Sequence, residues 1–250
     1  MTEKKLILKI EELSMNALPA IQTNIYDGWI VRFADGYTKR ANSINPIYFS
    51  TEDLNKKIET TEQMYRERNL KVVYKMTQQV SPDQLDRTLE KKGYFFDGLT
   101  SVQMLPLKDV EGERKHHAIV YNHLHDDWFM HFCHLNHVGE KDQQTLKIML
   151  RNIIAKTCYF LLSADKNEIL ACGMCVLDRE YIGLFDIVTS EKYRNRGYGS
   201  NLIEHILQWG KDHGAQYAYL QVMVNNAAAL NLYSKFGFKE IYRYWYRIKE

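Results

Sequence analysis

The chain has 250 residues, of which 45% are hydrophobic and 26% charged, and its formal net charge is +2 at neutral pH. This length allows one large domain or two small ones with an ordinary globular composition. A net charge so close to zero, without a platform of interleaved aromatic and basic residues, indicates no nucleic-acid partner.

No apolar run approaches the roughly 18 residues of a membrane span. The opening stretch, MTEKKLILKIEEL, has too short an apolar core for a signal peptide. The cysteines Cys133, Cys158, Cys172 and Cys175 do not resemble a secreted disulfide framework in a chain of this length. We therefore expect a soluble, cytoplasmic protein with no membrane partner.

The first hundred residues alternate helix and strand patterns. Residues 28–42 predict a hairpin that turns at Asp35-Gly36, and Thr51 is expected to cap the helix that follows. Ser81-Pro82 is expected to open a further helix, which Gly93 ends. In chain order, the predicted elements are a helix over 3–17, the hairpin, a helix over 51–68, a strand over 71–76, the helix from 81 to 93 and a strand region over 94–107.

The polar segment KDVEGERKHH (108–117) marks the expected domain boundary, with a smaller α/β domain over 1–107 and a second domain over 108–250. The alternation of strands and helices favours an α/β (α+β) sandwich. Beyond the boundary we expect a helical region over 118–156, two strands within 158–177 joined by a turn at 165–167, a strand over 181–189, a helix over 199–213, a strand over 217–224, a helix over 226–236 and a strand over 240–248.

One internal similarity connects the two halves. LEKKGYFFDGLTSVQM (89–104) resembles YSKFGFKEIYRYWYRI (233–248), with a helix end, a glycine-aromatic pair and a strand in the same order. A degenerate repeat of the second domain would explain the match. Coincidence is the alternative, because glycine commonly follows a helix.

The stretch YRNRGYGSNLIEHIL (193–207) places two glycines and two arginines directly before an amphipathic helix. A helix N-terminus presents unpaired backbone N–H groups and the positive end of the helix dipole. Glycines there permit positive φ and remove the Cβ atoms that would hold a ligand away. The arrangement suits a phosphate or pyrophosphate, and the alternative is a tight turn with solvated arginines.

Two signatures in this region resemble the GNAT superfamily of acetyl-CoA-dependent N-acetyltransferases. The first is an R/Q-x-x-G-x-G/A turn at Arg194, Gly197 and Gly199. The second, N-x-x-A-x-x-L-Y ahead of G-F, is formed by Asn226, Ala229, Leu232, Tyr233 and Gly237-Phe238. The resemblance covers 118–250, is locally close to ribosomal-protein alanine acetyltransferases, and implies a GNAT-like mixed sheet flanked by helices. It also implies acetyl-CoA as co-substrate and no metal.

Carried over residue by residue, the resemblance implies roles for the residues of both signatures. Val188 would donate its backbone N–H to the thioester carbonyl, and Tyr233 would protonate the departing thiolate. Asn226 would contact the pantetheine arm, although it or Asn225 can instead cap the helix. The residues implied in cofactor binding are Ile187, Val188, Thr189, Arg194, Asn195, Arg196, Gly197, Tyr198, Gly199, Ser200, Asn226 and Ala229.

The general base is not identified by the resemblance. The alanine acetyltransferases place a glutamate where this chain has Gln221, and glutamine cannot accept a proton from the attacking amine. Asp186, Glu240 and the histidines within 125–137 are the other candidates, and a water relay is a further alternative.

Two clusters favour structural roles. HFCHLNH (131–137) has the residue types of a metal site, but its pattern is that of an amphipathic helix, and we expect no metal there. CGMC (172–175) lies in a predicted strand, where alternation puts its cysteines on opposite faces as buried, unreactive thiols.

Together these features predict transfer of an acetyl group to a primary amine by direct attack in a ternary complex. A small-molecule acceptor is favoured over a peptide, and a protein N-terminus or lysine is the alternative within enzymes. A non-catalytic acyl-CoA sensor is the alternative outside them. The C-terminal aromatics Tyr242, Tyr244 and Trp245, if exposed, would be candidates for a homodimer interface.

Overall fold

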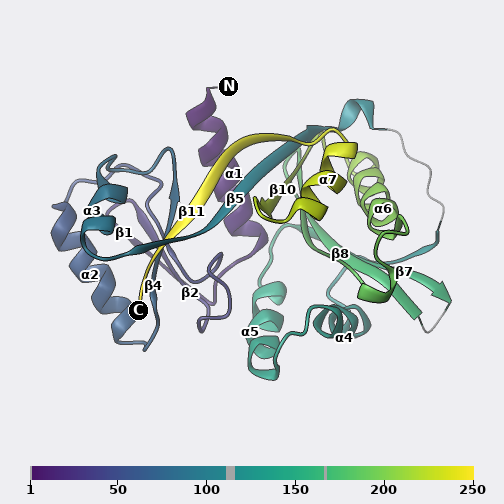
Figure 1. The fold of residues 1–250 in the computed structure, drawn as a ribbon, viewed down its shortest axis with the longest axis horizontal. Helices are drawn as coiled ribbons and strands as arrows, with labels where there is room; N and C mark the ends of the chain where they lie inside the picture. Colours follow the sequence, from purple (N-terminus) through teal and green to yellow (C-terminus); the bar gives the residue numbers. More distant parts are fainter. Residues whose placement is uncertain (1, 111–115, 166–167) are drawn as a thin grey trace. The chain divides into compact units, whose positions relative to one another are not determined.

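The computed structural model describes residues 2–110, 116–165 and 168–250 (Figure 1). The chain forms two compact units, one of residues 1–101 with 241–250 and one of residues 102–240. The expected boundary between 107 and 108 differs from this division. The chain instead passes from unit to unit inside two long strands, β5 (Phe95–Pro106) and β11 (Lys239–Lys249). The segment 108–117 and the turn 165–167 lie partly outside the described residues.

The first unit packs helices on a sheet whose strands run in the order β1-β2-β3-β4-β11. β1 and β2 form a hairpin, β3 and β4 are parallel, and β4 and β11 are antiparallel. A core of apolar and aromatic side chains, including Trp29, Tyr65 and Tyr74, holds the layers together. The remaining elements of this unit are α1 (Glu3–Ala17), β1 (Gln22–Tyr26), β2 (Trp29–Phe33), β3 (Ile44–Asn45), α2 (Leu54–Arg66), β4 (Val72–Thr77) and α3 (Leu85–Lys91).

Three expectations for this unit are wrong in detail. The hairpin turns at Asp27-Gly28, where both residues have positive φ, and not at Asp35-Gly36. Asp53, not Thr51, caps α2, because its side chain accepts a hydrogen bond from the Lys56 N–H at 3.0 Å. Helix α3 begins at Leu85, later than the Ser81-Pro82 pair.

A buried ion pair joins α1 to the sheet of the first unit. The Lys75 ammonium lies 2.6 Å from the Glu11 carboxylate, and the two side chains are 4% and 1% exposed. The Tyr242 hydroxyl donates to the same carboxylate at 2.7 Å, and the Tyr244 ring lies under the ammonium at 4.1 Å. Burying both charges is tolerated because each is paired and hydrogen-bonded.

The C-terminal aromatics that would be candidates for a homodimer interface if exposed are largely buried. Tyr242 and Tyr244 are both 3% exposed and belong to the interior of the first unit. Trp245 is half-buried and donates its indole N–H to Asp86 at 2.9 Å. These side chains therefore do not form an exposed aromatic surface.

The second unit contains a sheet in the order β5-β10-β9-β8-β7-β6. Residues 118–121 form an antiparallel edge strand, not the start of a helix as predicted. The other predicted elements are present within a few residues of their expected bounds. The elements of this unit after β5 are β6 (Ala118–Tyr121), α4 (Asp126–Leu135), α5 (Glu140–Arg151), β7 (Lys156–Asp165), β8 (Glu168–Asp178), β9 (Tyr181–Thr189), α6 (Tyr198–Asp212), β10 (Tyr217–Met223) and α7 (Ala227–Lys235), with 3-10 turns at Leu107–Asp109 and Glu191–Tyr193.

Helices α6 and α4 cover opposite faces of this sheet. A Cβ added at Gly173 in β8 would lie 3.3 Å from Leu202 and 3.5 Å from Ile206, both on α6. The adjacent Cys172 faces the other way, and the nearby Asp186 and Cys133 of α4 add to the effect of burial in raising its pKa. Figure 1 shows α6 lying along β7 and β8, which α6 contacts together with β9.

A bulge interrupts β9 in its second half. Met174 pairs with Phe185 and Cys172 with Val188, so Asp186 and Ile187 together oppose Gly173. Asp186 has a φ of 55°, and the Trp128 indole of α4 donates to the Gly173 carbonyl at 3.1 Å. An added Cβ at Gly173 would lie 2.5 Å from Ile187 Cδ1, so a larger residue there would require the end of the Ile187 side chain to move.

The two units repeat one order of elements. The series β1-β2-β3-α2-β4-α3-β5 corresponds to β7-β8-β9-α6-β10-α7-β11, and the third and fourth strands of each series are parallel. The sequence similarity between 89–104 and 233–248 falls on α3–β5 and α7–β11, at matching places in the two series. In the ranges that the structure describes, no helix is both long and apolar enough to cross a bilayer.

Removing the buried ammonium should destabilise the protein much more than removing an exposed one. We expect Lys75→Met to lower the free energy of unfolding by about 3–5 kcal/mol, because it leaves the Glu11 carboxylate buried without its cation. Lys71→Met is the matched control, since its pair with Glu250 is 63% and 65% exposed. It should cost less than about 1 kcal/mol. Urea unfolding of the two variants measures the difference, and equal losses would contradict the importance of the buried pair.

Candidate functional site

A cavity of about 640 Å³ lies in the second unit where β9, α6 and α7 meet. The predicted site residues line it, with the exception of Arg196. The complete lining is Ile187, Val188, Thr189, Tyr193, Arg194, Asn195, Gly197, Tyr198, Gly199, Ser200, Asn226, Ala228, Ala229, Asn231, Leu232, Tyr233 and Lys235. Two motifs about thirty residues apart in sequence therefore form one concave surface.

The N-terminus of α6 opens into this cavity. Gly197 is the N-cap residue, with a φ of 85° that favours glycine, and no side chain caps the helix. The first intrahelical bond runs from the Asn201 N–H to the Gly197 carbonyl at 3.0 Å. The backbone N–H groups of residues 198–200 precede that bond and are available to a ligand, and the helix dipole favours an anion there.

Gly199 is required for a different reason from Gly197. A Cβ at Gly199 would lie 3.2 Å from Thr189 Oγ1 and 3.3 Å from Leu232 Cδ2. A Cβ at Gly197 would meet nothing within 4 Å, so its requirement is conformational only. The first glycine of the turn thus sets the backbone, and the second keeps β9, α6 and α7 close together.

Of the two arginines in the turn, one lines the cavity and the other does not. Arg194 lines the cavity and lies 3.2 Å from the Glu191 carboxylate, in an exposed pair that a stronger anion can displace. Arg196 lies over the Tyr193 ring at 5.6 Å and is not part of the lining. Lys235, at the end of α7, lines the cavity and was not identified from the sequence.

Lys235 could have been found from helical spacing. It follows Ala228 by seven residues and Asn231 by four, so all three share one face of α7. Two other lining residues that were not predicted could have been found from their place in the sequence. Tyr193 adjoins the turn, and Leu232 belongs to the second signature.

The strand β9 supplies the wall beside the turn. It pairs with β10 over Tyr181–Gly183, against Tyr217–Tyr219. Past the bulge, Val188 and Thr189 register with Cys172 and Ala171 of β8 on the other side. In the part of the chain that the structure describes, the backbone N–H and C=O groups of residues 187–189 on the cavity edge of β9 are therefore not paired with β10.

Helix α7 contributes Asn226 and Tyr233 two turns apart. The Asn226 side-chain oxygen accepts from the Ala229 N–H at 3.1 Å, so the capping role is present in the structure. Its amide NH₂ can still donate to a ligand. Tyr233 is 8% exposed and packs edge-on against Phe238, and burial raises its pKa to about 12.

The base candidates are placed differently. Asp186 lies at the bulge, two residues before Val188, and its charge adds to burial in raising the pKa values of Cys133 and Tyr159. Gln221 lies in β10 and Glu240 at the start of β11, and none of the three candidates lines the cavity. Of these three side chains, Asp186 is the carboxylate beside the strand segment that lines the site.

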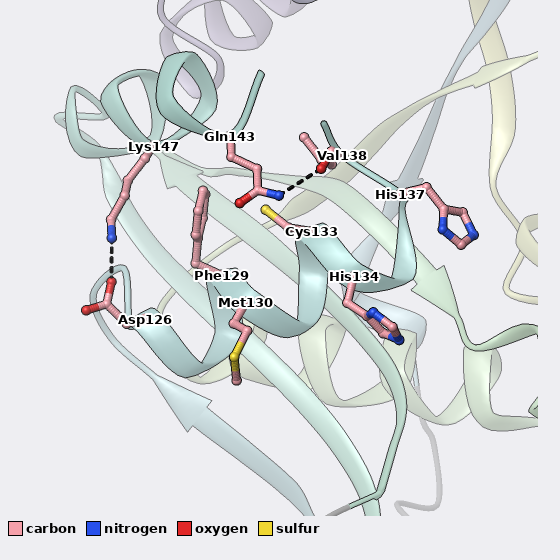
Figure 2. A pocket seen from close by; sticks show the side chains of 9 residues that line it. All are labelled: Asp126, Phe129, Met130, Cys133, His134, His137, Val138, Gln143 and Lys147. Atoms are coloured by element: carbon pink, nitrogen blue, oxygen red, sulfur yellow. Dashed lines mark hydrogen bonds and ion pairs between the residues drawn. The ribbon is translucent and has the colours of Figure 1, made fainter. Parts of the chain in front are cut away.

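The histidines of 125–137 lie on or next to α4. His134 and His137 border a groove of about 790 Å³ between α4 and α5, shown in Figure 2. Lys147 donates to Asp126 at 2.7 Å and Gln143 to the Val138 carbonyl at 2.8 Å, and these contacts connect the two helices. Among the residues that the structure describes, no three His, Cys, Asp or Glu side chains are grouped to hold a metal.

All four cysteines are buried and unpaired as disulfides. Burial raises the pKa of Cys133, in the groove of Figure 2, to about 11, with a smaller effect from Asp186. Burial also raises the pKa values of Cys172 and Cys175 well above the ordinary range. A protonated thiol is a poor nucleophile, so the C-x-x-C pair has the unreactive character predicted for it.

The chain is similar in sequence to proteins described as N-acetyltransferases. The Bacillus subtilis (strain 168) protein described as "Uncharacterized N-acetyltransferase YobR" is 28% identical over 250 residues, covering 97% of this chain and 98% of that protein. The ribosomal protein bS18-alanine N-acetyltransferase of Escherichia coli (strain K12) is 37% identical over 80 residues, which are 32% of this chain and 53% of that protein.

Structural similarity extends over both units. The GCN5-related N-acetyltransferase from Kribbella flavida matches with a TM-score of 0.73 at 12% identity, covering 97% of this chain and 95% of that one. The family described as "Probable histone acetyltransferase Rv0428c C-terminal" matches residues 6–247. The chain therefore belongs to this family and to the GNAT superfamily of N-acetyltransferases.

Proposed function

We propose that the second unit binds acetyl-CoA and transfers its acetyl group to a primary amine. The observation that carries the proposal is the N-terminus of α6, which has glycine in place of a capping side chain and opens into a cavity. Backbone donors and a helix dipole at one place form a binding site for the CoA diphosphate. Arg194 and Lys235 on the same lining add positive charge for the phosphates.

The remaining lining fits the arm of the same substrate. The cavity edge of β9 at 187–189 can pair with the pantetheine amides, and the Asn226 amide can donate to them. Ala229 is small and half-buried on the first turn of α7, which leaves room for the arm. The Val188 N–H would polarise the thioester carbonyl, because a fixed backbone donor needs little reorganisation as charge develops.

Tyr233 would act on the departing thiolate. A phenol whose pKa is about 12 stays protonated throughout the neutral range. It can therefore donate a hydrogen bond to sulfur as the carbon–sulfur bond breaks, and deliver its proton as the thiolate leaves. The reaction needs no covalent acetyl-enzyme, because both substrates are held together and the amine attacks the thioester directly.

Asp186 is the candidate we favour for taking the proton from the amine. The bulge places Asp186 in β9 two residues before the proposed oxyanion donor, and bulges are common next to active sites. Gln221 cannot accept that proton. Neither Asp186 nor Glu240 is on the cavity lining, but Asp186 directly precedes the lining segment 187–189.

The acceptor that we favour is a small-molecule amine. The chain has Gln221 where the resemblance places the glutamate of the alanine acetyltransferases, so their arrangement for a protein N-terminus is incomplete here. The alternative of a protein N-terminus or lysine is supported by local similarity to the bS18-alanine enzyme. Pools of amino acids, polyamines, aminoglycosides and short peptides, assayed for acetyl-CoA-dependent thiol release, distinguish the two. A sensor without catalysis would bind acetyl-CoA and release no thiol with any pool.

A side chain at Gly199 should block the cofactor cavity. We expect Gly199→Leu to weaken acetyl-CoA binding at least tenfold in calorimetry, because the added atoms project between Thr189 and Leu232. Gly139→Leu is the control, since Gly139 is also a helix N-terminal glycine but lies outside the cavity with no neighbour to its Cβ within 4 Å. Equal affinity for the two variants would contradict the proposed binding site.

Removing the Tyr233 hydroxyl should lower turnover and leave binding intact. We expect Tyr233→Phe to reduce kcat by about 10²-fold or more, the usual range for losing a general acid. Acetyl-CoA affinity should change less than threefold, and Tyr217→Phe, outside the cavity, should behave as wild type. Because the pKa of Tyr233 is about 12, wild-type turnover should show no alkaline decline due to this group below about pH 11. An unchanged kcat in Tyr233→Phe would exclude the tyrosine as the acid.

The Asp186 carboxylate should matter most when the amine must be deprotonated. We expect Asp186→Asn to lower kcat/KM by about 10²-fold at pH 7 and by less at high pH, where more amine is already neutral. The comparison is a pH profile of both proteins with the same acceptor. Parallel profiles with no loss would remove Asp186 as the base.

A further inference from the structure

The first unit contains a turn that matches the cofactor turn of the second in position and length. Eight residues, 46–53, connect β3 to α2, and eight residues, 190–197, connect β9 to α6. In each case the turn lies between the third strand of the repeated series and the helix that leads to a parallel strand. The two helix N-termini are thus equivalent places in one fold.

The two turns have net charges of opposite sign. The turn before α6 carries Lys192, Arg194 and Arg196 and has Gly197 at the N-cap. At the matching positions, the turn before α2 has Glu52 in place of Arg196 and Asp53 in place of Gly197. Asp53 caps its own helix by accepting from the Lys56 N–H. The first turn of α6 has no such hydrogen bond from a capping side chain.

A carboxylate already binds the backbone of the turn before α2, at Thr51 and Glu52, which match Asn195 and Arg196 of the turn before α6. Asp27, at the β1–β2 turn, accepts hydrogen bonds from the backbone N–H groups of Thr51 and Glu52, both at 2.9 Å. The hydroxyls of Ser50 and Thr51 donate to it at 2.9 and 2.7 Å, and the Lys57 ammonium lies 2.9 Å away. These donors hold the pKa of Asp27 far below its usual range, with the Glu52 N–H and the Thr51 hydroxyl as the largest causes.

Lys57 is the buried member of this arrangement, which otherwise reaches the surface at Thr51 and Glu52. Its side chain is fully buried, and its ammonium also donates to the Asp27 carbonyl oxygen at 2.5 Å and to the Ser50 hydroxyl. The Trp29 ring lies under it at 4.2 Å. A buried ammonium needs a permanent counter-ion, and Asp27 provides that charge from within the chain.

We propose that Asp27 is an internal substitute for a phosphate group, which closes the first unit to CoA and to other nucleotide diphosphates. The chain then binds one acetyl-CoA, in the second unit. The number of one acetyl-CoA per chain rests on the function proposed for the cavity at α6. The role of Asp27 in the first unit does not depend on that function.

The first test is the stoichiometry of acetyl-CoA binding to the intact chain, measured by native mass spectrometry. We expect one molecule per chain, and none for Gly199→Leu. Two molecules for the wild type, or one that Gly199→Leu retains, would overturn the proposal that the first unit is closed. No binding by the wild type would contradict the proposed function instead, and the second test would still decide the role of Asp27.

The second test removes the internal anion and supplies an external one. Asp27→Ala should lower Tm by several degrees, and inorganic phosphate or pyrophosphate should raise the Tm of this variant more than that of the wild type. Asp53→Ala is the matched control, because it removes a carboxylate from the same helix N-terminus without vacating the Asp27 position. A phosphate response no larger in Asp27→Ala than in Asp53→Ala would overturn the proposal.

Asp27→Asn keeps the shape of the side chain and serves if the alanine variant does not fold. Since the pKa of Asp27 is lowered in the folded protein, its charge stabilises the fold above the unfolded pKa of about 4. That contribution is lost as the pH falls towards the folded pKa. The difference in Tm between wild type and Asp27→Asn should therefore be constant from pH 8 to pH 5 and shrink below pH 4. A difference that does not depend on pH would show that the carboxylate charge is unimportant.

Discussion

The site depends on a helix N-terminus that the protein leaves without a cap. Strands β9 and β10 are parallel, so the chain must cross over through α6, and the crossover starts at the carboxyl end of β9. Glycine at the N-cap leaves the first backbone N–H groups of α6 without a side-chain acceptor. The same end of β9 is bent by the bulge over Gly173. The topology thus brings unpaired donors and a strand edge to one cavity.

Much of the second unit was readable from its sequence, because local signals agree there. Strand β9 was predicted with its observed bounds, and α6 to within one residue, since periodicity and glycine turns point to the same elements. The residues of the two motifs were identified from these local signals, and, apart from Gly237-Phe238, they line one cavity. The bulge at Asp186 was not readable, because it is a feature of the pairing of β9 with β8, where Gly173 opposes it and accepts from the Trp128 indole.

The first unit was harder to read because its turns depend on distant partners. Asp35-Gly36 has the composition of a hairpin turn, yet Asp27-Gly28 forms the hairpin, where the Asp27 side chain also binds the residues before α2. Strand β11 was assigned to the second domain because it is contiguous with it in sequence. In the structure its last nine residues belong to the first unit, where Tyr242 contacts the buried Glu11. Such long-range pairings leave no local pattern.

The central claim is that the open N-terminus of α6 binds acetyl-CoA. Backbone amide NMR of the intact chain, titrated with CoA, tests it most directly. The account predicts that the largest shifts fall on the amides of Gly197, Tyr198, Gly199 and Ser200, with Val188 responding to the acyl form only. The amides of Thr51 and Glu52 should stay unchanged. Saturating shifts elsewhere, with the α6 amides unmoved, would contradict the account.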